Sequence, residues 1–190
     1  MQFFVERYLT PQNLRVPSTA TRHNSAAELA AAVAADPHAL GLGTYSRTEP
    51  SVALPLRGSC GFESRATALT LKTEDYPLTA PLFLYLAAHR LPPIARAFLD
   101  DLASPGAAVV IRRAGYVDQR VAEVSLNDQG FRLANAIEAA GPEVGIAELK
   151  QLIGTLKPAR RLSIAFRFEG GSSELDTQSR ANVRLLGDAI

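Results

Sequence analysis

Residues 161–190, RLSIAFRFEGGSSELDTQSRANVRLLGDAI, carry the clearest fold signal of the chain. Apolar side chains alternate with polar or small ones over 162–168, which is the period of a half-buried strand. Its apolar positions are Leu162, Ile164, Phe166 and Phe168. Residues 170–173, Gly-Gly-Ser-Ser, predict a turn, and Asp176 is placed to cap a following helix. One strand and one helix cannot bury their own apolar faces, so the stretch is expected to dock on the preceding chain or to open a second domain.

Composition places the chain among globular proteins. It has 190 residues, of which 47% are hydrophobic and 21% charged, and 20 basic side chains balance 19 acidic ones for a formal net charge of +1. The charges form no long run, so neither nucleic acid nor an anionic membrane is an expected partner. No apolar run is long enough for a membrane-spanning helix, and the first residues lack the pattern of a signal peptide.

The pattern of elements predicts an α/β fold that becomes mostly helical toward its end. Helices are predicted over residues 3–9 (ended by Pro11), 26–35 (after a Ser25–Glu28 capping box), 94–103, 105–114, 126–140 and 146–156. Strands are predicted over residues 40–45, 52–56, 68–72 and 82–86. Because the run at 82–86 is continuously apolar, it is expected to be a central strand covered on both faces.

Four features follow one another between residues 25 and 119: a helix at 27–37, a short strand at 39–43, the segment KTEDYPLTAPLFLY at 72–85, and a helix pair interrupted by Ser-Pro-Gly. In this order they resemble the later part of an ABC-transporter substrate-binding protein of the phosphate-binding type. In that family a Tyr-Pro-Leu hinge like the one here re-enters the first lobe. The resemblance therefore implies an incomplete periplasmic-binding-protein-like unit and a small anion, such as phosphate, as partner.

Some features of that family are missing from this chain. Family members often carry Arg where this chain has Ala80, and the Ser-Gly-Thr turn that binds the anion does not occur. The early half of the first lobe is absent as well. The resemblance thus implies a fragment that binds phosphate weakly or not at all.

Three short segments near the end carry a second resemblance: Phe-Arg-Phe-Glu at 166–169, Gly-Ser-Ser-Glu-Leu-Asp at 171–176, and Ser-Arg-Ala-Asn-Val at 179–183. Together they are similar to the opening of an OmpA-like peptidoglycan-binding domain. The groups that bind peptidoglycan in that family would lie beyond Ile190, so this domain is expected to be truncated. The expected organisation is a partial binding-protein-like unit at 1–120, a helical connector at 121–157, and the start of the OmpA-like domain at 158–190.

The densest polar cluster beside the expected hinge is Lys72-Thr73-Glu74-Asp75-Tyr76. The ligand-binding candidates are Tyr45, Lys72, Thr73, Glu74 and Tyr76. An ordinary solvated turn is the competing interpretation of 72–76, and structural packing is the competing interpretation of Tyr45.

Catalytic and metal-binding interpretations find little support. His23, His38, His89 and Cys60 share no spacing typical of a nucleophile–base pair or of a metal site. No catalytic residue, metal or cofactor is predicted. The expected function is a non-enzymatic solute-binding component of the cell envelope, in the periplasm, that takes phosphate or another oxyanion and associates with peptidoglycan. The alternative is an envelope module with a structural or interaction role that binds no small ligand.

Overall fold

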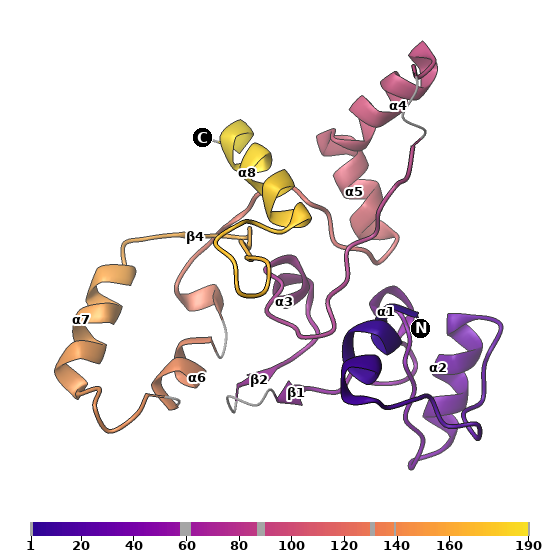
Figure 1. Ribbon diagram of the computed structural model, residues 1–190, viewed down its shortest axis with the longest axis horizontal. Coiled ribbons are helices and arrows are strands. Elements are labelled where there is room, and N and C mark those ends of the chain that lie inside the picture. The colour runs from indigo at the N-terminus through magenta and orange to yellow at the C-terminus, as the bar shows by residue number, and fades with distance from the viewer. Residues whose placement is uncertain (1, 58–61, 87–89, 130–131, 139, 190) are drawn as a thin grey trace.

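The computed structural model describes residues 2–57, 62–86, 90–129, 132–138 and 140–189. It combines helices with two small antiparallel sheets, which confirms the α/β class at the coarse level of mixed helix and sheet (Figure 1). The helices are α1 (Gln2–Phe4), α2 (Ala26–Ala35), α3 (Ala68–Lys72), α4 (Pro93–Leu102), α5 (Pro105–Arg113), α6 (Arg132–Glu138), α7 (Ile146–Leu156) and α8 (Thr177–Ala189). The strands are β1 (Leu56–Arg57), β2 (Glu63–Ser64), β3 (Glu123–Val124) and β4 (Arg161–Leu162). A π-helical turn (Val5–Leu9) and 3₁₀ turns at Thr10–Gln12, Tyr45–Arg47 and Asn127–Gln129 complete the regular structure of the described residues.

Local capping signals explain the helices that the sequence predicted correctly. The Ser25 hydroxyl accepts a hydrogen bond from the Glu28 amide at 3.1 Å, so Ser25 caps α2 as expected. The return bond to Glu28 Oε2 comes from the Asn24 amide at 3.2 Å, one residue before the N-cap, so only half of the predicted capping box forms. Ser104 caps α5 in the same way, through the Ala107 amide. Helices α4 and α7 also lie where they were predicted, and Asp176 caps α8 through the Ser179 amide.

The helices predicted over residues 3–9 and 126–140 differ from those in the structure. The first helical segment does not end at Pro11, because Pro11 lies inside the 3₁₀ turn and the chain leaves it at Asn13, whose φ is 56°. Pro fits there because the first turn of such a helix needs no amide donor. Of the helix predicted over 126–140, the described part contains the 3₁₀ turn and α6.

Of the four strands predicted between residues 40 and 86, three are wrong and the other is shorter than expected. Residues 40–45 form an irregular segment that enters the Tyr45–Arg47 turn, and Leu40 is 82% exposed. Residues 68–72 form α3, because Thr67 and Thr70 make a reciprocal capping box that selects the helix over the strand. Of 52–56, only Leu56 belongs to a strand.

The predicted central strand at 82–86 is also wrong. The segment follows an extended course to α4, but it pairs with no other described strand, and Phe83 and Leu84 are 57% and 58% exposed (Figure 1). A continuous apolar run predicts a buried strand, yet no sheet of more than two strands forms among the described residues to receive it.

The elements are arranged as arms around α3 (Figure 1). Helices α4 and α5 pack on each other and form one arm, α6 and α7 lie in a second, and α1 and α2 lie in a third. The sheet β3–β4 is the regular pairing that joins distant parts of the described chain, with Glu123 opposite Leu162. None of the described helices has the length and apolarity needed to cross a membrane.

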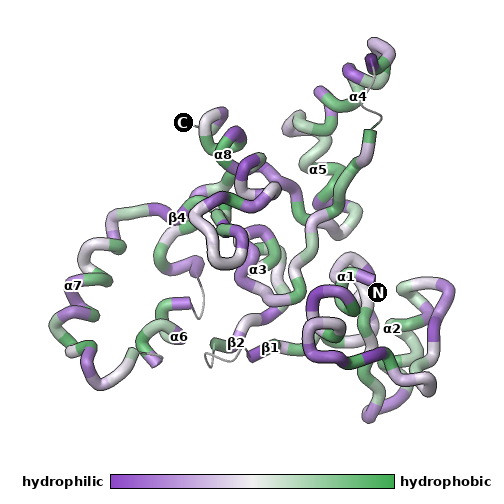
Figure 2. The backbone as a smooth tube through the Cα atoms, in the orientation of Figure 1, coloured by the Kyte–Doolittle hydropathy of each residue, from purple (hydrophilic) through white to green (hydrophobic). Residues whose placement is uncertain are grey.

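The interior of the molecule is small and largely polar. Among the described residues, the buried apolar side chains are Ala30, Ala108 and Val124, whereas the buried polar ones are Thr73, Asp118, Ser163, Ser179 and Asn182. Hydrophobic stretches are spread along the arms rather than gathered at one centre (Figure 2). The accessible surface is 14494 Å², against roughly 8,800 Å² for a compact monomer of this mass. The fold therefore depends on polar contacts to an unusual degree.

The C-terminal stretch, residues 161–189, is likewise held mainly by polar contacts. Its predicted strand is regular only in β4, and the predicted apolar face is not buried, because Phe166 and Phe168 are 42% and 60% exposed. Instead Ser163 is buried, where its amide donates to Ala122 O and its hydroxyl accepts from the Ala122 amide, both at 2.9 Å. Helix α8 attaches through Asn182, which donates to Ala165 O at 2.8 Å. Residues 170–173 form the predicted turn, in which Gly171 has a positive φ of 72°.

Candidate functional site

Helix α3 ends in a tight turn that presents successive polar side chains in different directions. Asp75 N–H donates to Thr70 O at 2.8 Å and Glu74 N–H donates to Leu71 O at 3.2 Å, which is the pattern of a Schellman motif. The left-handed position of that motif is Glu74, with φ of 56°. We call Lys72, Thr73, Glu74, Asp75, Tyr76 and Pro77 the hub, because each of them binds a distant part of the chain.

The first hub contact is a buried ion cluster centred on Asp118. Lys72 Nζ lies 2.9 Å from Asp118 Oδ1, and Arg112 Nη1 lies 2.8 Å from Oδ2. The Arg120 amide donates to Oδ1 as well, at 3.0 Å. The Asp118 side chain is only 4% exposed, so it is charged in a place where it depends on these donors.

The second hub contact is centred on Asp75. Arg161 grips this carboxylate with two nitrogens, Nη1 at 2.6 Å from Oδ2 and Nη2 at 3.0 Å from Oδ1, and Arg132 Nη1 adds a contact of 2.7 Å to Oδ1. The Thr73 hydroxyl donates to Oδ2 at 2.8 Å, and Arg161 Nη2 also donates to Thr73 O at 3.3 Å. This bidentate contact between Arg161 and Asp75 is the strong geometry for an arginine and a carboxylate.

The remaining hub residues bind two further segments. Glu74 Oε2 lies 2.6 Å from Arg167 Nη2. The Tyr76 hydroxyl donates to Leu54 O at 3.1 Å, and the Tyr8 hydroxyl donates to Pro77 O. The hub thus joins the N-terminal arm, the end of α5, the start of α6 and the C-terminal stretch.

The charges of the hub shift the pKa values of its acids. Burial alone would raise the pKa of Asp75, but hydrogen bonds from Arg161 and Thr73 and the charges of Arg161 and Arg132 outweigh it, so the pKa lies below 3.8. Burial would also raise the pKa of Asp118, but hydrogen bonds from Arg112 and Lys72 outweigh it, so the pKa of Asp118 is lowered too. Burial raises the pKa of the Tyr76 hydroxyl.

These features suit the carboxylates at the hub to holding the basic side chains of the chain in fixed positions. Both aspartates are anionic near neutral pH, and their oxygens are already occupied by donors. A carboxylate in this state is a poor proton acceptor. Five basic side chains meet three carboxylates here, and three of the five have about half of their side chains in solvent: Arg112, Arg132 and Arg167.

The structure brings together four of the five predicted ligand-binding residues. Lys72, Thr73, Glu74 and Tyr76 all lie in the hub, but their polar groups contact the chain itself. Tyr45 lies elsewhere, in the 3₁₀ turn that packs beside α2. His23 and His38 lie outside the hub, and the predictions for Cys60 and His89 fall outside the described residues.

Sequence reasoning missed the partners of the hub. The sequence places Asp75 in the polar cluster but not among the predicted site residues, and it predicts no role for Asp118. Arg112 pairs with Asp118, Arg132 and Arg161 pair with Asp75, and Arg167 pairs with Glu74. No local spacing connects Arg161 with Asp75, because 86 residues separate them.

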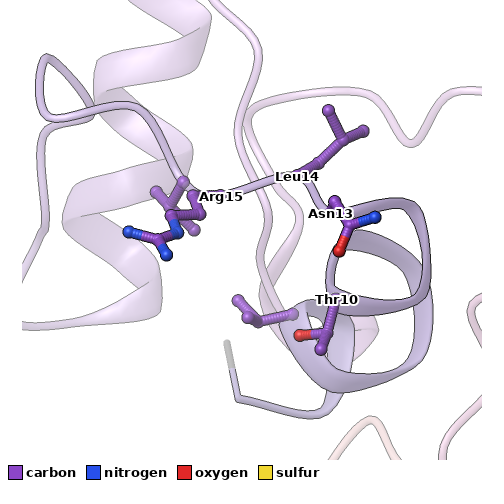
Figure 3. A pocket seen from close by; sticks show the side chains of 6 residues that line it. Thr10, Asn13, Leu14 and Arg15 are labelled. Carbon is purple, nitrogen blue, oxygen red and sulfur yellow. The ribbon is translucent and has the colours of Figure 1, made fainter.

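Hollows of the surface lie away from the hub. One of about 310 Å³ is lined by Val5 of the π-helical turn and by residues between Thr10 and Val16, and Figure 3 shows Arg15 extending away from Thr10 there. Another of about 420 Å³ lies between the Asn127–Gln129 turn and the end of α7. In the part of the chain that the structure describes, no three His, Cys, Asp or Glu side chains gather closely enough to hold a metal ion.

Comparison with known proteins gives no assignment. No family model, no curated protein and no solved structure matches the chain.

Proposed function

We propose that the chain belongs to a non-enzymatic solute-binding component of the cell envelope, located in the periplasm, whose ligand class is phosphate or a related oxyanion. The observation that carries this proposal is the order of elements between residues 25 and 119. Helix α2, the hub, α4, the Ser-Pro-Gly break and α5 occur in the order of the resemblance to phosphate-type binding proteins, but the short strand that the resemblance implies at 39–43 is irregular. The surplus of basic over acidic side chains at the hub suits an anion.

The same proposal includes association with peptidoglycan. It rests on the resemblance of the segments between residues 166 and 183 to the opening of an OmpA-like domain. The hub links this stretch to the rest of the chain, because Arg161 and Arg167 are both paired with hub carboxylates.

A second candidate is a structural or interaction module that binds no small ligand. One observation favours it: the polar groups of Lys72, Thr73 and Glu74 are engaged by other parts of the chain. An anion at the hub would compete with Asp118 for Arg112 or with Asp75 for Arg132, which weakens binding.

Calorimetric titration with inorganic phosphate separates the two candidates. Under the first, we expect weak saturable binding with a Kd above about 1 mM, or about −4 kcal/mol, because no Ser-Gly-Thr turn supplies convergent amide donors. Sodium chloride at equal ionic strength should give no saturable heat. Binding should weaken in Arg132→Ala and persist in Arg96→Ala, a change of an exposed arginine on α4.

Two outcomes would count against the first candidate as stated. Phosphate heats equal to those of chloride would leave the structural module as the better account. Binding with a Kd below about 10 μM (−7 kcal/mol) would mean that a built anion site exists that the hub geometry does not explain.

A further inference from the structure

The segment at residues 82–86, Leu-Phe-Leu-Tyr-Leu, has the properties of a strand without a partner. Its backbone makes no hydrogen bond to any other residue that the structure describes. Its five side chains are between 49% and 88% exposed. An extended apolar segment with open backbone donors and acceptors is a template for pairing with another chain.

We propose that this segment pairs with the same segment of a second copy of the chain, as an antiparallel two-fold interface centred on Leu84. The segment is self-complementary about that residue. In the antiparallel register Leu82 faces Leu86 of the second copy, Phe83 faces Tyr85, and Leu84 faces Leu84. The leucines of both copies then share one face, and the aromatic rings share the other.

Charge and geometry favour this occupant. No charged residue occurs between Tyr76 and His89, so two copies meet without like-charge repulsion. Phe83 and Tyr85 already lie with ring centroids 6.4 Å apart at a tilt of 51°, and both are more than half exposed, so the rings of a second copy can reach them. Pro81, which lacks an amide donor, limits the ladder at the N-terminal end.

The exposed area limits the size of this interface. The five residues expose on the order of 650 Å² per copy, which is the most that this segment alone can bury and is less than the ~800 Å² that each partner contributes to a standard interface, so a weak, concentration-dependent dimer is expected. No strand elsewhere in the described part of the chain is longer than two residues, so the chain itself offers no sheet edge of matching length.

The first test is the oligomeric state of the full chain, by light scattering coupled to size exclusion across a range of concentrations. We expect a concentration-dependent dimer. Leu84→Lys places two like charges opposite each other on the two-fold axis, so its dissociation constant should rise at least tenfold. Leu40→Lys, an identical change at another exposed leucine, should leave the dimer intact. A monomer at all concentrations, or equal behaviour of the two variants, would overturn the proposal.

A second test fixes the register without relying on stability. In a Cys60→Ser background, Leu84→Cys should form an interchain disulfide on mild oxidation, because opposite Cα atoms lie ~5 Å apart. Leu82→Cys alone should not, because its copies would lie ~13 Å apart, but it should crosslink when mixed with Leu86→Cys. Crosslinking of Leu82→Cys with itself would show a parallel register and overturn the two-fold model. Leu40→Cys serves as the control for random collision.

Discussion

Asp118 illustrates how single residues hold this fold together. Its carboxylate is nearly inaccessible to solvent, yet it has three donors, from Lys72, Arg112 and the Arg120 amide. A charge in such a place is stable only while its partners remain. Because so few apolar side chains are buried, the loss of one ionic contact is not compensated by a surrounding core.

Replacing Asp118 by Asn should therefore destabilise the chain strongly. The amide keeps the size of the side chain but removes its charge, which leaves Lys72 cationic and mostly buried. We expect a loss of about 3 kcal/mol in the free energy of unfolding, measured by urea titration. Glu63→Gln is the matched control, because its partner Arg65 is largely exposed, and it should cost roughly 0–1 kcal/mol. Equal losses in the two variants would contradict the assignment.

Asp75 in the hub and Asp118, which pairs with Lys72 of the hub, also predict a dependence of stability on pH. Each has a lower pKa in the folded chain than the ordinary 3.8. The stability they contribute is complete well above pH 3.8 and is lost as the pH falls through their lowered folded values. Unfolding curves between pH 7 and pH 2 should show this loss in the wild type. Asp118→Asn should show a smaller loss over the same window, and an unchanged slope would refute the linkage.

At the scale of elements, the turn after α3 stands out because its left-handed position is occupied by glutamate. A residue with a Cβ is strained there by roughly 1–2 kcal/mol, whereas glycine is not. The chain retains glutamate, whose carboxylate pairs with Arg167. The turn thus combines a strained backbone at Glu74 with an ion pair to the C-terminal stretch.

Two substitutions at this position should separate the strain from the ion pair. Glu74→Ala loses the ion pair and keeps the strain, while Glu74→Gly loses the ion pair and removes the strain. We expect the glycine variant to be more stable than the alanine variant by about 1 kcal/mol in thermal or urea unfolding. Equal stabilities would indicate that Glu74 does not adopt the left-handed conformation in solution.

Helices were more predictable than strands for a physical reason. The start of α2 is decided by Ser25 and Glu28, three residues apart, and that of α5 by Ser104 and Pro105. A strand needs a distant partner, and the apolar alternation after Arg161 carries no information about one. The hub was found as a polar cluster, but its partners were missed, since the pairing of Asp75 with Arg161 depends on how the whole chain folds back.

At the scale of the whole molecule, the accessible surface is the dominant feature. The chain buries about half of the surface that its unfolded form would expose, where a compact domain of this size buries about 70%. The sequence composition did not reveal this, because 47% hydrophobic content is normal for a globular protein. The exposure of apolar side chains on the arms follows from how the elements are arranged in space, not from the composition.

This openness predicts a shallow response to denaturant. The slope of the unfolding free energy against urea concentration scales with the surface exposed on unfolding. At concentrations low enough for the monomer, we expect a slope roughly three quarters of that of compact domains of equal length. A slope equal to theirs would mean that the arms close onto one another in solution.

The long reach of the hub has a consequence for the order of events during synthesis. Asp75 leaves the ribosome 86 residues before Arg161, which at cellular rates of elongation is a delay of roughly 4–17 s. Throughout that interval the nascent chain contains Asp75 but not Arg161, the arginine that contacts its carboxylate with two nitrogens. The early arms must therefore persist without their central tie, and the final architecture is set only when the last strand has been translated.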